Sequence, residues 1–312
     1  MSKILFLGYS DIAIRRVIPA INKIGDISSI DISSRSRKVE ASKKIKNVYK
    51  SYEDGIDESD CDVIYISLPN SLHFEYAMKS LMKQRNVIID KPAVLNLSQL
   101  QELQAIAEKN NLFISQSCVF EYHKAWKKFK DLTNNYKKGT LTATFLIPEL
   151  NADNFRMSKE LGGGSMNDMG IYASQSGRSF WGSNSESIYI KDISNQSDSL
   201  NIGFSGHANY GDEREAFFEF GFNRQYKNKV IFSNDNFSIS YERAFSPPED
   251  LNTRLLIQEK EDIKEIETGF DDTFTNYLKD VYERYKNNDI DTINKEFKDS
   301  TEEFLNFKKE LK

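Results

Sequence analysis

The sequence is poor in the residues that build disulfide frameworks, metal centres and membrane spans. It has two cysteines and three histidines in 312 residues, without the clustered spacing of a zinc site. Two cysteines cannot form a disulfide framework, so we expect a reducing, cytoplasmic compartment. No apolar run approaches the roughly 20 residues of a membrane helix, and Gly8 and Asp11 come too early for the apolar core of a signal peptide. We therefore expect no metal and no membrane partner.

The chain also has no excess of positive charge, and it has few glycines. The chain has 42 basic and 47 acidic residues and a net charge of -5, which provides no electrostatic reason to expect nucleic acid as a partner. Its composition, 39% hydrophobic and 29% charged, is that of a globular protein, and its length suggests about two domains of roughly 150 residues. There are 15 glycines, and three of them are consecutive at 162–164.

The first part of the chain alternates short apolar runs with helical segments. The runs that predict strands are 3–7, 27–32, 62–67, 86–90 and 112–117. The clearest helix is 96–111, where Asn96 and Gln99 have the spacing of a capping box. Strands separated by single helices imply right-handed crossovers and a doubly wound parallel sheet of the Rossmann type. Such sheets bind ligands at the carboxyl ends of their strands.

The second part has a different pattern. After Trp181 the chain shows short alternating runs that predict antiparallel strands of a half-exposed sheet, at 187–193, 200–206, 215–222, 228–233, 237–242 and 253–259. Two closing helices are expected, one with Phe274 and Val281 on one face and one that begins near Ser300, with a capping-box spacing to Glu303. We therefore predict an α/β protein with a Rossmann-type cofactor domain at 1–118. The second domain, at 119–312, is expected to be α+β with an open, mostly antiparallel sheet, and the closing helices could pack back on the first domain.

A damaged dinucleotide-binding turn follows the first strand. Such a turn has the form G-x-G-x-x-G/A and brings backbone N–H groups and a helix N-terminus up to a pyrophosphate. Gly8 and Ala13 fit this form, but Ser10 replaces the middle glycine, where a side chain would crowd a phosphate, and Asp11 adds a negative charge. We predict that Gly8, Ser10, Asp11 and Ile12 contact a cofactor. The alternative is an ordinary strand-to-helix turn.

The end of the second predicted strand favours one nicotinamide cofactor over the other. An NAD site needs an acidic residue there to bind the ribose 2′-OH. This chain offers Ser33, Ser34 and Arg35 instead, and hydroxyls beside a guanidinium suit a 2′-phosphate. We therefore predict NADP(H) rather than NAD(H), with a solvated basic turn as the alternative.

Four segments resemble the glucose-fructose oxidoreductase/inositol dehydrogenase/MocA (Gfo/Idh/MocA) family. They are 62–81, with a Pro-Asn pair and a histidine after a strand; Asp90-Lys91-Pro92; 154–182, with an arginine, a glycine run and Asp-x-Gly-x-Tyr; and 243–250. The resemblance covers essentially the whole chain, and its third segment is the specific one. It implies hydride transfer between a nicotinamide and a hydroxyl- or carbonyl-bearing carbon of a sugar, cyclitol or related compound. It also implies an open C-terminal sheet with one face at the substrate site and the other in a homodimer or homotetramer.

The resemblance places Lys91 at the carboxyl edge of the first sheet, in a Lys-Pro pair whose peptide bond is often cis in the family. A lysine there can hydrogen-bond a substrate oxygen and stabilise the negative charge that develops on it. Burial near a cationic nicotinamide would lower its pKa and make proton transfer feasible. The alternative is a solvent-exposed lysine. Around Lys91, the expected cofactor contacts are Leu68, Pro69, Asn70, His73 and Asp90; for His73 the alternative is a histidine that only begins a helix.

The third segment supplies the remaining candidates. Asp168 and Tyr172 are four residues apart, so a helix places them on one face. Tyr172 stands where the family has a histidine or a tyrosine, and a phenol close to Lys91 can act as general acid. Asp168 would hold a substrate hydroxyl or orient the lysine. Asn154 and Arg156 could reach a substrate oxygen. The alternatives are helix packing for Asp168, a half-buried aromatic for Tyr172 and a structural salt bridge for Arg156.

Two functional hypotheses remain open. The first is an NADP(H)-dependent ketoreductase or dehydrogenase acting on a sugar or sugar nucleotide. The second is a non-catalytic member of the same fold that binds a nucleotide or a partner. Ser10, Asp11 and Glu121, which stands where the family commonly has an arginine, favour the second. Lys91 and Tyr172 favour the enzyme.

Overall fold

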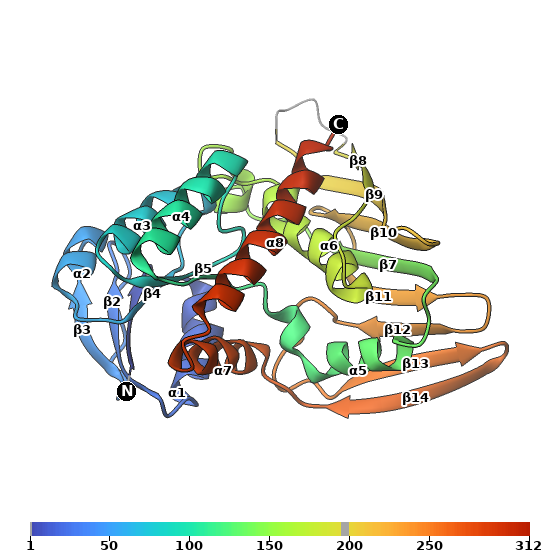
Figure 1. Cartoon of the computed structure of the whole chain (residues 1–312), viewed down its shortest axis with the longest axis horizontal. Coiled ribbons are helices and arrows are strands. Elements are labelled where there is room, and N and C mark those ends of the chain that lie inside the picture. The colour runs from blue at the N-terminus through green and yellow to red at the C-terminus, as the bar shows by residue number, and fades with distance from the viewer. Residues whose placement is uncertain (1, 195–199) are drawn as a thin grey trace. The chain divides into compact units, whose positions relative to one another are not determined.

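The computed structural model describes residues 2–194 and 200–312, which form two compact units. Unit 1 consists of Met1–Ser117 and Phe274–Thr301, and unit 2 consists of Cys118–Thr273 and Glu302–Lys312. Each unit is built around one sheet (Figure 1). The last helix, α8 (Ile290–Lys309), contributes its first part to unit 1 and its final turns to unit 2.

The sheet of unit 1 has six strands in the order β3-β2-β1-β4-β5-β6, and all its pairings are parallel. The strands are β1 (Ser2–Leu7), β2 (Ile27–Ser33), β3 (Ile45–Tyr49), β4 (Val63–Ile66), β5 (Asn86–Ile89) and β6 (Ile114–Gln116). Strand order reverses between β1 and β4, so their carboxyl ends form the topological switch point at which such folds bind ligands. The predicted Rossmann-type sheet is confirmed, although the edge strand β3 was not among the predicted strands.

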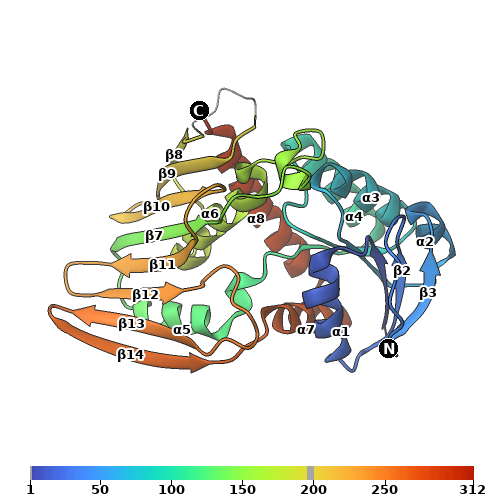
Figure 2. The same ribbon diagram turned by 180° about the vertical axis from the view of Figure 1, so that it is seen from behind.

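Helices flank this sheet on both sides. They are a π-helical segment at Ala13–Val17, α1 (Ile18–Asn22), α2 (Tyr52–Glu58), α3 (Asn70–Met82), α4 (Leu97–Asn110) and α7 (Thr273–Lys286). Figures 1 and 2 show α3 beside α4, and α7 beside α1. The guanidinium of Arg16, in the π-helical segment before α1, lies 5.3 Å from the centroid of the Phe274 ring of α7. Pro19 falls at the start of α1, directly after the π-helical segment, where its missing N–H is tolerated. The predicted cap of α4 is present, because Asn96 Oδ1 accepts a hydrogen bond from Gln99 N at 3.0 Å.

The sheet of unit 2 has eight strands in the order β14-β13-β12-β11-β7-β10-β9-β8. They are β7 (Gly139–Leu146), β8 (Ser187–Asp192), β9 (Gly203–Asn209), β10 (Arg214–Gly221), β11 (Lys227–Ser233), β12 (Ser238–Glu242), β13 (Thr253–Glu259) and β14 (Asp262–Gly269). Only β7 and β10 pair in parallel, so the predicted mostly antiparallel sheet is confirmed. Strands β7 and β14 were not predicted; β14 is a highly charged edge strand, which lacks a strong hydrophobic signal.

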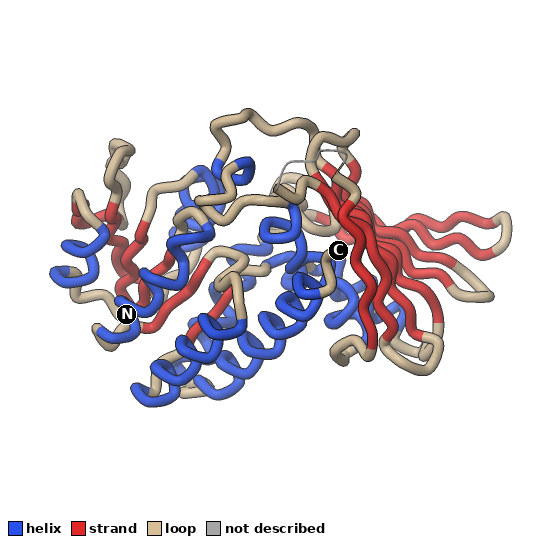
Figure 3. Tube along the Cα trace, turned by 90° about the horizontal axis from the view of Figure 1, so that it is seen from above, coloured by secondary structure: helices blue, strands red, loops and turns tan. Residues whose placement is uncertain are grey.

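Helices cover one face of this second sheet. The 3-10 helices Val119–Tyr122 and Phe155–Met157 accompany α5 (Lys124–Thr133) and α6 (Ser165–Trp181). Figure 3 shows both α-helices on the same side of the strands. Side chains of β10 show the difference between the covered and the uncovered face, because Ala216 and Phe218 are buried whereas Phe217 between them is 46% exposed. Within residues 2–194 and 200–312, no helix covers the opposite face of this sheet.

The predicted start of the last helix near Ser300 is wrong. Helix α8 begins ten residues earlier, at Ile290, and Ser300 lies in its interior, where its hydroxyl donates to Phe297 O at 3.1 Å. A serine can bond back to a helix carbonyl as readily as it caps a helix, so a serine and a glutamate three residues apart do not by themselves mark an N-terminus. Glu303 instead accepts a hydrogen bond from Ser185 N at 3.0 Å.

The described residues contain neither a membrane-spanning helix nor a cluster of metal ligands. None of their helices is long and apolar enough to cross a bilayer. Among the same residues, no group of His, Cys, Asp and Glu side chains is placed to hold a metal ion. Cys61 is buried and Cys118 is half-buried, and neither forms a disulfide within the described residues.

Candidate active-site residues

The turn after β1 passes very close to the end of β4. Gly8 has φ +96°, and a Cβ built on it would lie 2.2 Å from Ser67 O. Only glycine fits at this position, because both the backbone conformation and the lack of space exclude a side chain. The first position of the dinucleotide turn therefore requires glycine, and its approach to a pyrophosphate stays a prediction.

The Ser10 side chain is held by protein groups. Its Oγ accepts a hydrogen bond from Ala13 N at 3.1 Å and lies 2.6 Å from Ser67 Oγ. The first N–H groups of a helix have no partner within the helix, and Ser10 therefore satisfies one of them.

The negative charge of Asp11 has a local partner. Arg37 Nη1 donates to Asp11 Oδ1 at 2.7 Å and to Tyr9 O at 3.3 Å. Arg37 lies in the basic segment after β2 but was not among the predicted contacts, because a pairing across 26 residues leaves no local signal in the sequence. Among the predicted ones, Ser34 Oγ donates to Arg37 O at 2.6 Å, and the guanidinium carbon of Arg35 lies 5.0 Å from the centroid of the Tyr52 ring. These contacts bring the basic turn and the first turn together.

Ser33 and Ile12 differ in their surroundings. Ser33 is fully buried at the end of β2, and its Oγ lies in the space that a Cβ on Gly55 would need. Ile12, in contrast, is 36% exposed in the first helical turn. Contact of either residue with a cofactor stays a prediction.

Asp90 is held by hydroxyl groups at the carboxyl edge of the sheet. It accepts hydrogen bonds from Tyr65 OH at 2.6 Å, Ser67 Oγ at 2.6 Å and Ser117 Oγ at 3.0 Å. Burial, together with the neighbouring Asp90 charge, raises the pKa of Tyr65, which keeps that phenol a donor. The next peptide bond, Lys91–Pro92, is cis. Lys91 therefore follows a carboxylate that is fixed by three donors.

His73 connects the turn after β4 to the turn after β5. It is fully buried, with Nδ1 2.8 Å from Pro92 O and Nε2 2.8 Å from Leu68 O. Burial lowers the pKa of His73. Asn70, which is also buried, begins α3 directly after Pro69. The structure thus brings the predicted residues of the two turns to one edge of the sheet, and their contact with a cofactor stays a prediction.

In unit 2 the glycine run packs against the segment that carries Arg156. A Cβ built on Gly163 would lie 2.4 Å from Arg156 O, and Gly164 N donates to the same oxygen at 2.8 Å. Asn154 Oδ1 accepts from Arg156 N at 3.1 Å and caps the short 3-10 helix. Arg156 Nε lies 3.0 Å from Asp168 Oδ2, and the Asp168 side chain is only 8% exposed. The salt bridge that the sequence left as an alternative for Arg156 is therefore present.

Tyr172 lies one helical turn beyond Asp168 and is surrounded by phenylalanines. Its ring centroid is 6.0 Å from that of Phe120, 5.8 Å from Phe145 and 5.5 Å from Phe245. These three residues come from a 3-10 helix, β7 and the segment after β12, so no local pattern groups them. Phe245 belongs to 243–250, a segment that the family resemblance already included, whereas Phe120 and Phe145 were missed.

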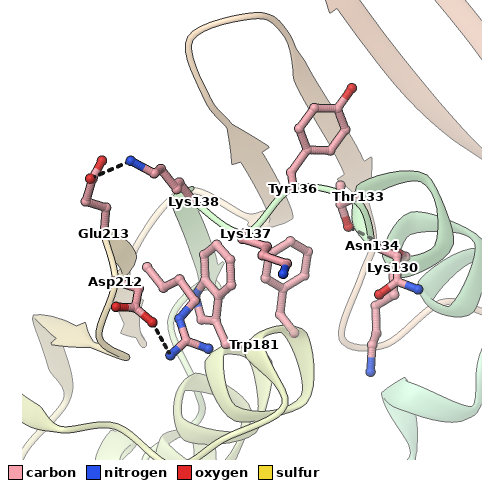
Figure 4. Close-up of a pocket in the computed structure, with 11 residues that line it drawn as sticks. Lys130, Thr133, Asn134, Tyr136, Lys137, Lys138, Trp181, Asp212 and Glu213 are labelled. Carbon is pink, nitrogen blue, oxygen red and sulfur yellow. Dashed lines mark hydrogen bonds and ion pairs between the residues drawn. The ribbon is translucent and has the colours of Figure 1, made fainter.

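Unit 2 also contains a cavity of about 640 Å³ at a different place (Figure 4). Its lining residues are Lys130, Thr133, Asn134, Tyr136, Lys137, Lys138, Phe180, Trp181, Asp212, Glu213 and Arg214. Two of its cations have acidic partners, since Lys138 lies 2.6 Å from Glu213 and Arg214 lies 3.9 Å from Asp212. None of the predicted site residues lines this cavity, and we assign it no part in hydride transfer.

Sequence comparisons relate the chain to known enzymes. Residues 3–117 match a family model described as an oxidoreductase family with an NAD-binding Rossmann fold. The dTDP-3,4-didehydro-2,6-dideoxy-alpha-D-glucose 3-reductase of Saccharopolyspora spinosa is 26% identical over 274 residues, which cover 85% of this chain and 82% of the relative. The D-xylose 1-dehydrogenase (NADP(+)) 2 of Haloferax volcanii is 26% identical over 184 residues, 56% of each protein.

Solved structures agree on the fold. A 3-ketoreductase from Actinomadura kijaniata, in complex with NADP and TDP-benzene, matches with a TM-score of 0.90 at 20% identity, covering 100% of this chain and 98% of that one. Forms of the same ketoreductase with a tyrosine changed to phenylalanine or a lysine changed to alanine match with TM-scores of 0.89 and 0.85. Residues 3–117 therefore match the Rossmann domain of the Gfo/Idh/MocA family of oxidoreductases, and the Saccharopolyspora spinosa relative extends the sequence similarity across the second unit.

Proposed function

We propose that this chain is an NADP(H)-dependent reductase that transfers a hydride to the carbonyl carbon of a sugar or sugar nucleotide, and that it also catalyses the reverse reaction. The observation that carries the proposal is the Asp90-Lys91-cis-Pro92 turn, whose carboxylate is held by three hydroxyls at the carboxyl edge of the Rossmann sheet. The ammonium of a lysine at that edge is suited to a substrate oxygen that becomes negative during reaction.

The residues of unit 1 fit a nicotinamide dinucleotide. The Gly8 turn lets the backbone approach a pyrophosphate closely, and a helix N-terminus follows it. Ser34, Arg35 and Arg37 offer a hydroxyl and two guanidinium groups that suit a 2′-phosphate. Asp31, the carboxylate on β2, is fully buried and accepts from Ser59 Oγ at 2.8 Å, so it is engaged within the protein. These features support NADP(H) over NAD(H).

When bound, the nicotinamide supplies or accepts the hydride. We assign to Lys91 a hydrogen bond to the substrate oxygen, which stabilises the negative charge on that oxygen as the carbonyl is reduced. We assign to Tyr172 the role of general acid, which donates its phenolic proton to the substrate, and the rings of Phe120, Phe145 and Phe245 pack around its partly buried ring. Asp168, held by Arg156, accepts a hydrogen bond from a substrate hydroxyl.

The relatives support the substrate class. The Saccharopolyspora spinosa relative is a reductase of a dTDP-linked keto-sugar, and the Actinomadura kijaniata structure holds TDP-benzene. Of the three features that favoured a non-catalytic member, two have local explanations, because Ser10 is engaged by Ala13 and Ser67, and Asp11 pairs with Arg37. Glu121, the third feature, has no such explanation. We therefore favour a thymidine-diphosphate-linked keto-sugar as the first compound to test.

We also propose a homodimer or homotetramer formed through the sheet of unit 2. The face of that sheet without helices carries Tyr189, Phe217 and Ile263, which are 58%, 46% and 69% exposed. Exposed apolar side chains on a wide sheet face favour association with another sheet. Sedimentation analysis should show a dimer or tetramer, and Phe217→Lys should shift the association equilibrium toward the monomer. A monomeric wild type would contradict this assembly.

Cofactor binding tests the proposed function directly. NADPH should raise the melting temperature and change the fluorescence of Trp126 and Trp181, and NADH should do so only at higher concentration. If neither cofactor has an effect, the proposal fails. Lys91→Met should lower kcat about 100-fold to 1,000-fold while the NADPH affinity changes little. Lys109→Met, which removes an exposed lysine of α4, is the matched control and should keep full activity.

A further inference from the structure

A chain of hydroxyl groups joins the first turn of unit 1 to the residue before Lys91. Ser10 Oγ lies 2.6 Å from Ser67 Oγ, and Ser67 Oγ donates to Asp90 Oδ2 at 2.6 Å. Ser67 is only 4% exposed, so water competes little for these bonds. Three segments that are far apart in the sequence, the ends of β1, β4 and β5, are thereby connected through side chains.

The direction of each bond follows from the number of protons. The single hydroxyl proton of Ser67 is donated to Asp90, so Ser67 can only accept from Ser10. Ser10 in turn accepts from Ala13 N at 3.1 Å. Donors therefore point the same way throughout, from the helix N-terminus to the Asp90 carboxylate. Hydrogen bonds in such a series polarise and strengthen one another.

We propose that Ser10 is a positioning residue that couples the first turn to the Asp90-Lys91 pair. This inference rests on the proposed function. The glycine that usually occupies this position has no hydroxyl, so it could neither bond to Ser67 nor satisfy Ala13 N. Ser10 is then a specific feature of this chain and not a loss from the dinucleotide turn. Asp90 keeps its bonds from Tyr65 and Ser117 when Ser10 is changed, so the effect of Ser10 on Lys91 is partial.

The connection can be tested in the protein without cofactor or substrate. Ser10→Ala, Ser67→Ala and the double variant form a cycle for urea unfolding. If the two serines belong to one hydrogen-bonded series, their losses of unfolding free energy should not be additive. The double variant should then lose less than the sum of the losses of the two single variants. Additive losses would overturn the proposal.

A second serine provides the matched control. Ser51 caps α2 as Ser10 caps its own helix, because Ser51 Oγ accepts from Asp54 N at 3.0 Å. Ser51→Ala combined with Ser67→Ala should be additive, since no bond connects these two side chains in the described structure. Non-additivity in the control pair would show that loss of any helix cap produces the effect, and would count against a specific link.

Steady-state kinetics test the positioning role. Ser10→Ala should lower kcat roughly threefold to tenfold, the effect of one lost hydrogen bond, with a smaller change in the KM for NADPH. Ser10→Thr, which keeps the hydroxyl, should recover most of that loss. If Ser10→Gly leaves kcat unchanged and tightens NADPH binding, Ser10 is only a damaged glycine position and the proposal is overturned. If the wild type binds no nicotinamide, the proposed function fails, whereas the unfolding cycle still decides whether the hydroxyl chain exists.

Discussion

The candidate residues of the two units are held in place by different physical means. In unit 1, Asp90 is fixed by three hydroxyl donors, and the buried His73 ring lies between two backbone carbonyl oxygens, each 2.8 Å from one of its nitrogens. In unit 2, Tyr172 is surrounded by phenylalanine rings at 5.5 to 6.0 Å between centroids. Directional hydrogen bonds orient Asp90 in unit 1, whereas the packing of aromatic rings positions Tyr172 in unit 2.

This difference has consequences for substitution. A hydrogen bond and an aromatic pair each contribute about 1 kcal/mol, so neither arrangement is intrinsically stronger. A hydrogen bond depends steeply on distance and angle, and its loss leaves a buried polar group without a partner. Ring packing tolerates small displacements but excludes water. The hydrogen bonds of unit 1 are therefore suited to fixing the Asp90 oxygens, and the rings of unit 2 are suited to positioning the partly buried Tyr172 ring.

The largest expected effect comes from removing one oxygen and leaving the packing intact. Tyr172→Phe should lower kcat about 100-fold to 10,000-fold, because it removes the assigned general acid. The free energy of unfolding should change by less than about 1 kcal/mol, since the contacts of the ring remain. Tyr136→Phe, at an exposed tyrosine outside the candidate site, should change neither quantity. Full activity of Tyr172→Phe would leave the aromatic cluster with a purely structural role.

The next effect tests how tightly the glycine run packs in unit 2. Gly163→Ala should destabilise the protein by about 1–3 kcal/mol, because its Cβ would meet backbone atoms of Arg156 and Ser158 at 2.4 to 2.7 Å. Gly25→Ala is the control, because its Cβ would meet nothing within 4 Å. That control should be neutral or stabilising by about 0.5 kcal/mol. Equal unfolding midpoints for the two variants would contradict the close approach.

A smaller effect is expected from the ion pair between Arg156 and Asp168 in unit 2. Arg156→Met should cost about 1–2 kcal/mol, because it leaves the Asp168 carboxylate nearly buried and without this partner; the 32% exposure of Arg156 limits the loss. Asp168→Asn and the double variant complete a cycle in urea unfolding. The double variant should be more stable than the sum of the single losses predicts. Additivity would show that the pair contributes nothing to stability.

The smallest expected effect concerns pH and a residue outside the candidate site. Glu303 is fully buried on α8, and burial raises its pKa. As pH rises above the ordinary glutamate pKa of 4.5, Glu303 ionises in the unfolded chain before it ionises in the folded protein. The free energy of unfolding therefore falls until the pH passes the raised pKa of Glu303 in the folded protein. Glu303→Gln should remove this loss while keeping an oxygen to accept from Ser185 N. Unfolding free energies between about pH 4 and pH 8 should therefore fall less in this variant than in the wild type, and parallel curves would contradict the expectation.

Local patterns in the sequence predicted much of this arrangement. The Gly8 turn, the Asp90-Lys91-Pro92 turn and the glycine run before Asp168 each lie within a few residues, so a single strand end or helix start reveals them. The same locality explains the failure at Ser300, where a spacing that resembles a helix cap lies inside a continuous helix. A short motif indicates which bonds a residue is able to make, and the surrounding chain decides which of them form.

The sequence by itself determined the parallel sheet of unit 1, the mostly antiparallel sheet of unit 2, the place of Lys91 just after a strand and that of Tyr172 on a helix after the glycine run. These follow from hydrophobic periodicity and from motifs that are continuous along the chain. Only the tertiary structure decided that Ser10 bonds to Ser67, that Arg37 pairs with Asp11 and that Phe120, Phe145 and Phe245 surround Tyr172. The physical reason is that these contacts join residues 26 or more positions apart, where periodicity carries no information and the packing of strands selects the neighbours.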